Sequence, residues 1–325
     1  MRFKFSLFIV LIVFGIISVG KVFASSPDDI SVNIIPQNPA PNENTAINLS
    51  SYADNLDTVL INWSVGGRSV SSGIGKKSFS VTAPAAGTEK DITATISLPD
   101  GDIDKKIIIR PTVMVLLWQA DDSYVPPFYK GKAMPSPQSE VKVVALPEII
   151  TGGKMVDPAN MTYAWKQDYN NVQDSSGYGK NYFIYTNDYL DDSNNVDVTA
   201  STVDQNYSSE ASLSIGTYQT KIEFYKDDAN LGTLFEQALS DGHKIQGSEV
   251  VQAAPYFISP KEIGNPLLTW SWSINDSAVS VPSYSENLIP LAAQAGVSGT
   301  SKIDLQINNS YKVFETASKE INVNF

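Results

Sequence analysis

Three short alternating stretches, each centred on a tryptophan, constrain this chain more than any other feature. They run over residues 61–65, 163–167 and 270–274, and their central residues are Trp63, Trp165 and Trp272. In a strand, the residues two places before and after the tryptophan share its face. These neighbours are hydrophobic except Gln167 in the second stretch. The tryptophans lie 102 and 107 residues apart, which is the size of one β-sandwich domain. We therefore expect each stretch to be a central strand with its indole in a core.

Other segments recur in the same order, which indicates an internal repeat. A Gly-x-Gly-Lys motif follows the first tryptophan at 73–76 and the second at 177–180, whereas the third is followed by Ser283-Tyr284-Ser285. Four further pairs match between the second and third repeats: Leu117-Trp118 with Phe224-Tyr225, Asp121-Asp122 with Asp227-Asp228, Lys132-Ala133-Met134 with Gln237-Ala238-Leu239, and Ser139-Glu140-Val141 with Ser248-Glu249-Val250.

Local signals predict one early strand and two turns, and they leave room for very little helix. A strand is expected at Ile30 to Ile35, a tight hairpin at Gly66-Gly67, and a turn at Asp100-Gly101. Only the stretch from Leu231 to Leu239 could be helical, over one turn or two at most.

Composition excludes several classes of protein. The net charge of −12 argues against a nucleic-acid partner, because an acidic chain repels phosphate backbones. The chain contains no cysteine, so thiolate zinc sites, iron–sulfur clusters and disulfides are excluded. Hydrophobic residues make up 42% of the chain, which is enough for several cores.

The N-terminus has the features of a secretory signal peptide. Arg2 and Lys4 precede an apolar run from Phe5 to Val19, and Ala24 offers a small residue before the expected cleavage at Ser25. The alternative is an uncleaved membrane anchor, although the run is shorter than the ~20 residues that a spanning helix needs. Removing the segment would also remove three basic residues and leave a net charge of −15. The expected organisation is a signal peptide or anchor at 1–24 and domains at 25–111, 112–218 and 219–325.

With these repeats, the chain resembles the tandem immunoglobulin-like, PKD-like domains of secreted or surface bacterial proteins. The strings at 73–79 and 118–133 resemble uncharacterised secreted proteins of candidate-phylum bacteria. The resemblance implies an all-β fold of three tandem immunoglobulin-like β-sandwich domains after the signal peptide, an extracytoplasmic location, and no catalytic residue. Unlike antibody-type domains, the chain lacks paired cysteines, so its tryptophans are expected to pack on aliphatic side chains alone.

Few residues offer chemistry. His243 is the only histidine and lies in an Asp-Gly-His-Lys turn, so a histidine-based triad or zinc site would have to rely on it alone. Acidic stretches could supply oxygen ligands to calcium, but Asp-Gly and Asp-Asp are ordinary turn chemistry. The acidic candidates are Asp100, Asp102, Asp104, Asp121, Asp122, Asp191, Asp192, Asp197, Asp227 and Asp228. We expect turns, no metal and no cofactor.

Aromatic residues in loop-like contexts suggest either sugar stacking or packing between domains. They are Tyr124, Phe128, Tyr129, Tyr178 and Tyr182. The Gly-x-Gly-Lys pair is not a phosphate-binding loop, because no helix follows it.

The sequence therefore predicts a non-enzymatic structural or adhesive protein, secreted or attached to the cell envelope and built as a semi-rigid array. Its short junctions, such as 110–112, lack the glycine and serine of a flexible linker. A glycan- or protein-binding module of the cell surface is the alternative, and an accessory region of an extracellular hydrolase is a more distant one. The expected partners are envelope or extracellular proteins or surface glycans, with membrane contact only if the N-terminal segment is uncleaved.

Overall fold

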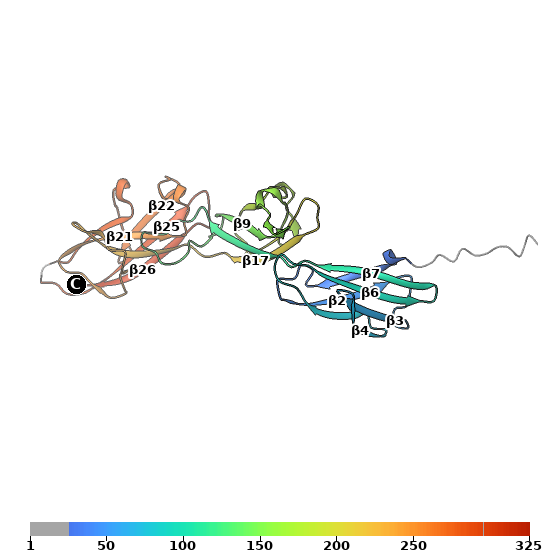
Figure 1. The fold of residues 1–325 in the computed structure, drawn as a ribbon. Helices are drawn as coiled ribbons and strands as arrows, with labels where there is room; N and C mark the ends of the chain where they lie inside the picture. Colours follow the sequence, from blue (N-terminus) through green and yellow to red (C-terminus); the bar gives the residue numbers. More distant parts are fainter. Residues whose placement is uncertain (1–25, 295) are drawn as a thin grey trace, which may run out of the picture. The chain divides into compact units, whose positions relative to one another are not determined.

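The protein is a succession of β-sandwiches, as the computed structural model shows (Figure 1). The structure describes residues 26–294 and 296–325, so the expected signal segment at 1–24 lies outside it. The chain divides into two compact units, and the boundary along the sequence lies between Thr112 and Val113. The first unit contains one hydrophobic core and the second contains two.

The first unit is a sandwich of a three-stranded and a four-stranded antiparallel sheet. The smaller sheet contains β1 (Ile30–Ile35), β2 (Asn44–Ser51) and β5 (Ser78–Thr82). The larger sheet contains, in spatial order, β4 (Arg68–Ile74), β3 (Leu60–Val65), β6 (Lys90–Leu98) and β7 (Gly101–Ile109). A 3₁₀ turn, η1 (Pro27–Asp29), precedes the first strand. The strand from Ile30 to Ile35 and the hairpin at Gly66-Gly67 are confirmed; both glycines have positive φ, as a tight hairpin requires.

The second unit begins with a sandwich of the same strand order. One sheet contains β8 (Val113–Ala120), β9 (Glu140–Glu148) and β15 (Tyr182–Thr186). The other contains β13 (Asn170–Asn171), β12 (Thr162–Gln167), β16 (Ser193–Ser201) and β17 (Ser208–Gly216), with β14 (Gly177–Tyr178) paired to β12. The connections carry a hairpin and two 3₁₀ turns: β10 (Ile150–Thr151), β11 (Lys154–Met155), η2 (Pro158–Asn160) and η3 (Gln173–Ser175).

The last sandwich completes the second unit. One sheet contains β19 (Gly232–Thr233), β18 (Lys221–Asp228), β21 (Ser248–Tyr256) and β24 (Leu288–Ala292). The other contains β20 (His243–Lys244), β26 (Ala317–Asn324), β25 (Thr300–Asn309), β22 (Leu268–Ile274) and β23 (Ser277–Val279). The connections hold a one-turn helix, α2 (Pro260–Ile263), and a 3₁₀ turn, η4 (Ser283–Ser285).

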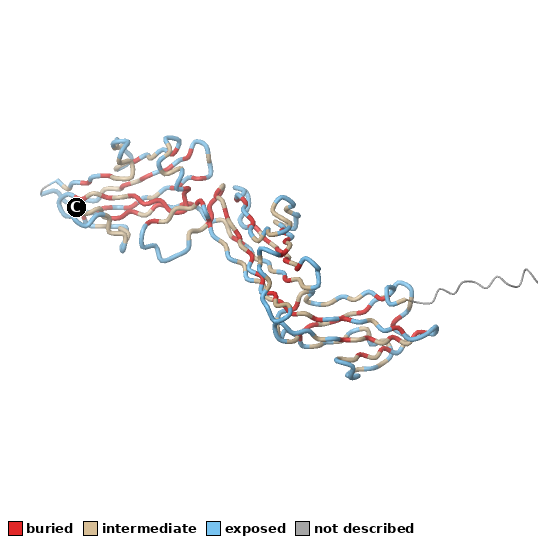
Figure 2. The backbone as a smooth tube through the Cα atoms, turned by 45° about the horizontal axis from the view of Figure 1, so that its top comes forward, coloured by how far each residue is buried: buried red, intermediate tan, exposed pale blue. Residues whose placement is uncertain are grey.

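All three sandwiches share one topology. Each has seven main strands, counted along the chain: β1–β7 in the first, β8, β9, β12, β13 and β15–β17 in the second, and β18 and β21–β26 in the last. The first, second and fifth of the seven form one sheet, and the third, fourth, sixth and seventh form the other. Buried positions alternate along these strands, so the cores lie between the two sheets (Figure 2). The prediction of an all-β chain of immunoglobulin-like sandwiches is confirmed, whereas the ranges given for the individual domains stay a prediction.

The three tryptophans are buried in the cores, and each is tethered in the same way. Trp63, Trp165 and Trp272 are at most 2% exposed. Their indole N–H groups donate to the backbone carbonyls of Lys76, Lys180 and Glu286, each at 2.8 Å. The residue after each of these acceptors in turn accepts a bond from the second main strand, with Leu49, Ala145 and Ala253 as donors. The crossing segment is thus bonded to both sheets.

This tether explains the Gly-x-Gly-Lys motif. Gly75 and Gly179 adopt φ values of +68° and +69°, and their N–H groups donate to Val59 and Met161. A Cβ at Gly75 would lie 2.8 Å from the Asp57 carbonyl oxygen. Glycine therefore turns the chain so that the next residue, a lysine, presents its carbonyl to the indole.

The expectation of purely aliphatic packing around the tryptophans is wrong. Phe79 stacks on Trp63 with a centroid distance of 5.2 Å, Phe183 lies 5.8 Å from Trp165, and Phe224 stacks on Trp272 at 5.4 Å. The two rings of each pair come from opposite sheets of the sandwich. Aromatic side chains are large enough to meet across the space between the sheets.

The stretch from Leu231 to Leu239, the one that could have been helical, forms no helix. Gly232 adopts φ +73°, and Gly232–Thr233 form β19 against β18. The Leu239 N–H donates to the Phe224 carbonyl, so pairing with the sheet replaces helical bonds. No helix in the described ranges 26–294 and 296–325 is long and apolar enough to cross a membrane.

Candidate functional site

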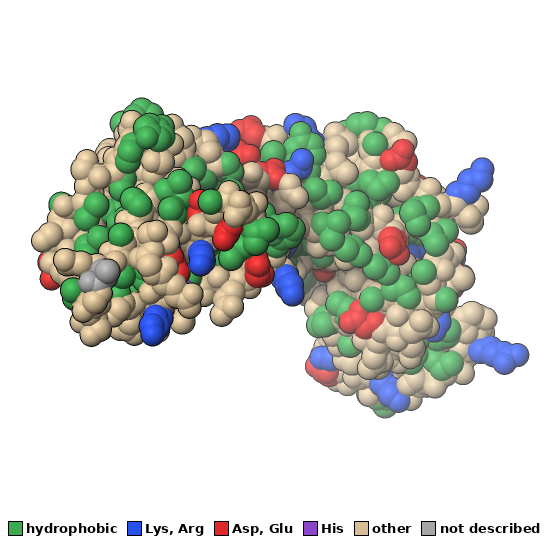
Figure 3. All heavy atoms as spheres, turned by 90° about the vertical axis from the view of Figure 1, so that its left-hand side faces the viewer, with side chains coloured by type: hydrophobic (Ala, Val, Ile, Leu, Met, Phe, Trp, Pro, Cys, Tyr) green, Lys and Arg blue, Asp and Glu red, His purple; other side chains and the backbone are tan. Residues whose placement is uncertain are grey.

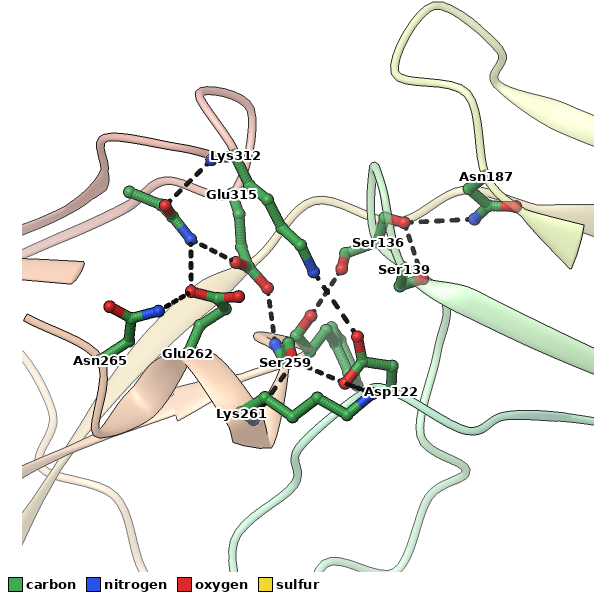
Figure 4. A network of polar contacts seen from close by, with 12 residues as sticks. Asp122, Ser136, Ser139, Asn187, Ser259, Lys261, Glu262, Asn265, Lys312 and Glu315 are labelled. Carbon is green, nitrogen blue, oxygen red and sulfur yellow. Dashed lines mark hydrogen bonds and ion pairs between the residues drawn. The ribbon is translucent and has the colours of Figure 1, made fainter. Parts of the chain in front are cut away.

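The most elaborate arrangement of polar side chains lies inside the second unit, where the segment after β8 and the loop at 135–139 meet the segment after β21. Figure 4 shows this set of contacts, which we call the junction. Most of its residues lie in loops, whereas Lys261 belongs to α2 and Asn309 ends β25. The loops carry the turn residues Asp, Ser, Asn and Pro, which suit irregular backbone.

Hydrogen bonds from two neighbouring segments hold the backbone around Phe257, and we call these bonds the clamp. The Phe257 N–H donates to the Tyr124 carbonyl at 2.7 Å, and the Phe257 carbonyl accepts from Ser136 Oγ at 2.6 Å. The Tyr124 N–H donates to the Ile258 carbonyl at 2.8 Å. Phe257 has φ +66°, which costs a bulky residue roughly 1–3 kcal/mol. The clamp stabilises that backbone conformation.

A charged cluster follows the clamp. Ser259 Oγ donates to Asp122 Oδ1 at 2.5 Å, and Lys312 Nζ lies 3.5 Å from Asp122 Oδ2. Lys261 Nζ approaches the same carboxylate at 3.9 Å. Asp122 is only 7% exposed, so its charge needs these partners.

Glu315 supports the cluster from the loop before β26. Its carboxylate accepts from the Ser259 N–H at 2.6 Å and from Asn309 Nδ2 at 2.8 Å. Burial raises the pKa of the Glu315 carboxyl above its usual value, outweighing the hydrogen bond from Ser259 and the charge of Lys312, which both lower it. The side-chain oxygen Oδ1 of Asn309 accepts from the N–H groups of Tyr311 and Lys312, which fixes the loop that presents Lys312.

A chain of amide side chains, of which Asn187 and Asn194 are buried, connects the junction to β12 of the preceding sandwich. Gln167 Nε2 donates to Asn194 Oδ1 at 2.7 Å, and Asn194 Nδ2 donates to Asn187 Oδ1 at 3.2 Å. Asn187 Nδ2 reaches the Ser136 carbonyl at 3.2 Å. Gln167, the residue that breaks the hydrophobic pattern around Trp165, is therefore the inner end of this chain.

Aromatic contacts add apolar area around the polar centre. Tyr189, in the loop after β15, stacks on Phe314 at a centroid distance of 4.3 Å and an angle of 6°. Tyr129 packs edge-on against Tyr256 at 5.4 Å. Of the aromatic candidates from the sequence, Tyr124 and Tyr129 therefore lie at the junction.

The other aromatic candidates lie elsewhere. Phe128 is 86% exposed, and Tyr178 is 60% exposed and donates to Asn160. Tyr182 is 49% exposed, with the Lys142 ammonium 5.3 Å from its ring centroid.

His243 contacts a buried carboxylate instead of standing free. Its Nε2 lies 2.9 Å from Glu249 Oε2, and Lys226 Nζ lies 3.4 Å from Glu249 Oε1. Burial acts to raise the pKa of Glu249, but hydrogen bonds from His243, the Gln246 N–H and Lys226 outweigh it, so that the pKa lies below its usual value.

Several of the acidic candidates have hydrogen-bond partners of their own. Asp104 accepts from Thr95 Oγ1 at 2.6 Å, and Asp228 accepts from the N–H groups of Asn230 and Leu231. No group of three or more potential metal-ligating side chains occurs among the residues whose placement is given. The repeated Asp-Asp pair differs in role, because Asp122 belongs to the junction whereas Asp228 caps a tight turn.

Comparisons with known proteins give only distant likenesses. No protein-family model and no curated protein matches this chain. Among solved structures, the three N-terminal domains of the bacteriophage RB49 highly immunogenic outer capsid protein are 11% identical; the match covers 91% of this chain and 97% of that one, with a TM-score of 0.25. The central fibronectin-III array of RIM-binding protein is 11% identical over 93% of this chain and 99% of that one, with a TM-score of 0.31.

A bacterial example is the fibronectin(III)-like modules of Clostridium thermocellum CbhA, at 15% identity over 58% of this chain and 95% of that one, with a TM-score of 0.27. At such scores the chains do not superpose as wholes, so these likenesses carry no argument about function.

Proposed function

We propose that this is a non-enzymatic structural or adhesive protein, secreted or attached to the cell envelope, in which immunoglobulin-like domains form a semi-rigid array. The observation that carries the proposal is the buried junction of the second unit. Buried polar groups are stable only when they find partners, so a junction of this kind favours one relative placement of its two sandwiches. A protein that needed free rotation there would gain nothing from burying Asp122, Ser259 and Glu315.

Spin labels test the rigidity that this function requires. The chain has no cysteine, so Glu210→Cys and Ser318→Cys, at exposed positions of β17 and β26, would label these two sites alone. We expect a single narrow distance distribution by pulsed electron resonance. Asp122→Ala should broaden it, because Lys312 and Ser259 lose their partner, whereas the exposed neighbour Asp121→Ala should not. A broad distribution in the unsubstituted chain would remove the basis of the proposal.

Export is the second component of the proposal, and residues 1–24 support it. Mass spectrometry of protein collected from the growth medium or envelope should find Ser25, or a residue close to it, at the N-terminus. An intact Met1 in membrane fractions would instead identify an anchor.

The proposed partners are envelope or extracellular proteins or surface glycans, and the proposal names no catalytic residue. The single histidine is bound to a buried carboxylate. Positive side chains do not gather into a patch on the face drawn in Figure 3, where both signs are dispersed among uncharged residues. Such a surface gives no support to a nucleic-acid partner.

A further inference from the structure

An open groove of about 510 Å³ lies on the last sandwich, beside the junction. Its lining comes from the end of β21, from residues 263–266 at and after the end of α2, from Trp270 on β22, and from η4 and the residues after it. Tyr124, from the clamp segment, completes the lining. The volume lies within the roughly 300–1,000 Å³ typical of small-ligand sites.

Three aromatic side chains line this groove. Trp270 is half-buried and packs against the core, which fixes its ring. Tyr284, on η4, is 89% exposed, so almost the whole ring is available. Tyr124 is half-buried, and burial raises the pKa of its hydroxyl, which therefore stays protonated as a donor. Aromatic faces offer apolar area to a ligand whose own faces are apolar.

The polar groups of the groove are largely unused by the protein. The Trp270 indole N–H has no hydrogen-bond partner in the described ranges, unlike the N–H of Trp272 two residues later. The side chains of Ser283, Glu286 and Asn287 likewise have no partner within the part of the chain that the structure describes, because the bonds of Glu286 and Asn287 involve only their backbone carbonyls. These groups can donate to and accept from a hydroxylated ligand.

Charge and backbone chemistry narrow the class of ligand. Glu286 is the one charged residue in the lining of this groove, which disfavours phosphates and acidic sugars. Pro255 and Pro266 lack N–H groups, so this wall of the groove cannot extend its sheet onto a peptide strand. A ligand with apolar faces and many hydroxyls, but no charge, meets all of these conditions.

We propose that this groove binds a neutral saccharide chain, with Trp270 and Tyr284 stacking on sugar rings and Glu286 and Asn287 bonding to hydroxyls. This site goes beyond the structural role above, and its failure would leave the test of rigidity untouched.

Affinity electrophoresis of the full chain in gels containing soluble β-glucan, galactomannan or mannan tests the proposal, with the acidic polymer polygalacturonate as comparison. We expect retardation in at least one neutral gel and none in polygalacturonate. Tyr284→Ala should weaken binding about fivefold by loss of stacking, and Tyr311→Ala, at a 76% exposed position outside the groove, should not.

A second variant separates stacking from folding. Trp270→Phe keeps an aromatic ring against the core but removes the N–H donor, so it should weaken binding while the circular dichroism and melting temperature stay close to those of the unsubstituted protein. Unchanged mobility in all three neutral gels would overturn the proposal. So would unaltered binding by Tyr284→Ala, or retardation by an unstructured protein such as casein but by none of the polysaccharides.

Discussion

At the scale of single residues, the indole N–H of each core tryptophan contributes a hydrogen bond in addition to the burial of the ring. The ring buries hydrophobic area, and the N–H holds the segment that crosses between the sheets. An indole N–H buried without a partner would cost about 1–3 kcal/mol, so the carbonyl of Lys76, Lys180 or Glu286 is a structural requirement.

Substitution of Trp63 separates these two contributions. Trp63→Ala should lower the stability of the first unit by about 3–5 kcal/mol because it leaves a cavity. Trp63→Phe should cost less, about 1–3 kcal/mol, because chiefly the bond to the Lys76 carbonyl is lost. Hydrogen exchange followed by mass spectrometry of the full chain would report this as faster exchange in peptides from residues 26–112.

Peptides from Val113–Phe325 are the internal control, since they belong to the other compact unit. Equal loss of protection in both units, or a phenylalanine variant as unstable as the alanine one, would contradict this account.

Residue patterns predicted the buried tryptophans but not their acceptors. Alternation shows which face a side chain occupies, and Trp63 followed it. A carbonyl acceptor has no sequence signature of its own, and the only available signal was the glycine before Lys76. Gln167 was likewise visible only as an exception to the hydrophobic pattern, because its partner Asn194 lies 27 residues away.

At the scale of elements, the match of Ser139-Glu140-Val141 with Ser248-Glu249-Val250 places β21 one residue out of register with β9. The bonds from the Ala145 and Ala253 N–H groups make those two residues equivalent. Counting back from them, Glu249 takes the inward position of Val141, not that of Glu140. The Ser-Glu-Val match was therefore out of register, and a strand one residue out of register presents its other face.

The inward Glu249 makes stability depend on pH. Its folded-state pKa is lowered, so its contribution is present above its unfolded pKa and is lost as the pH falls through the folded pKa. The difference in melting temperature between the unsubstituted chain and Glu249→Gln should therefore be largest near neutral pH and shrink by pH 3. Calorimetry at both pH values checks this. A difference that did not change with pH would mean that His243 and Lys226 do not stabilise the carboxylate.

At the scale of the whole molecule, the sandwich fold was accessible from the sequence and the junction was not. Hydrophobic alternation is local, whereas the contact between Ser259 and Asp122 joins residues 137 apart. The repeated Asp-Asp pair drew attention to Asp122, but nothing local distinguished it from Asp228, which is half-buried at the end of β18 and caps the turn that follows. Long-range partners of this kind follow from packing and not from periodicity.

Removal of metal ions should leave stability unchanged. Two of the carboxylates that could bind calcium already have partners: Asp104 accepts from Thr95, and Asp122 accepts from Ser259, with Lys312 nearby. Melting temperatures with a chelator and with millimolar calcium should agree within experimental error. A clear rise with calcium would identify a site, and Asp100, Asp102 and Asp104 would be the first residues to substitute.

The polar junction of the second unit also has a mechanical consequence. Hydrocarbon surfaces that are pulled apart tend to adhere to other molecules. Asp122, Ser259 and Lys312 would instead exchange their mutual bonds for bonds to water, so parting this polar centre adds no hydrocarbon surface to that of the ring pair Tyr189 and Phe314. Under tension, this unit should lengthen first at the junction, while both cores stay folded, and should close again when the load falls. Repeated stretching of single molecules would show this as a small reversible extension before the first unfolding event, so the unit would take up load without losing its fold.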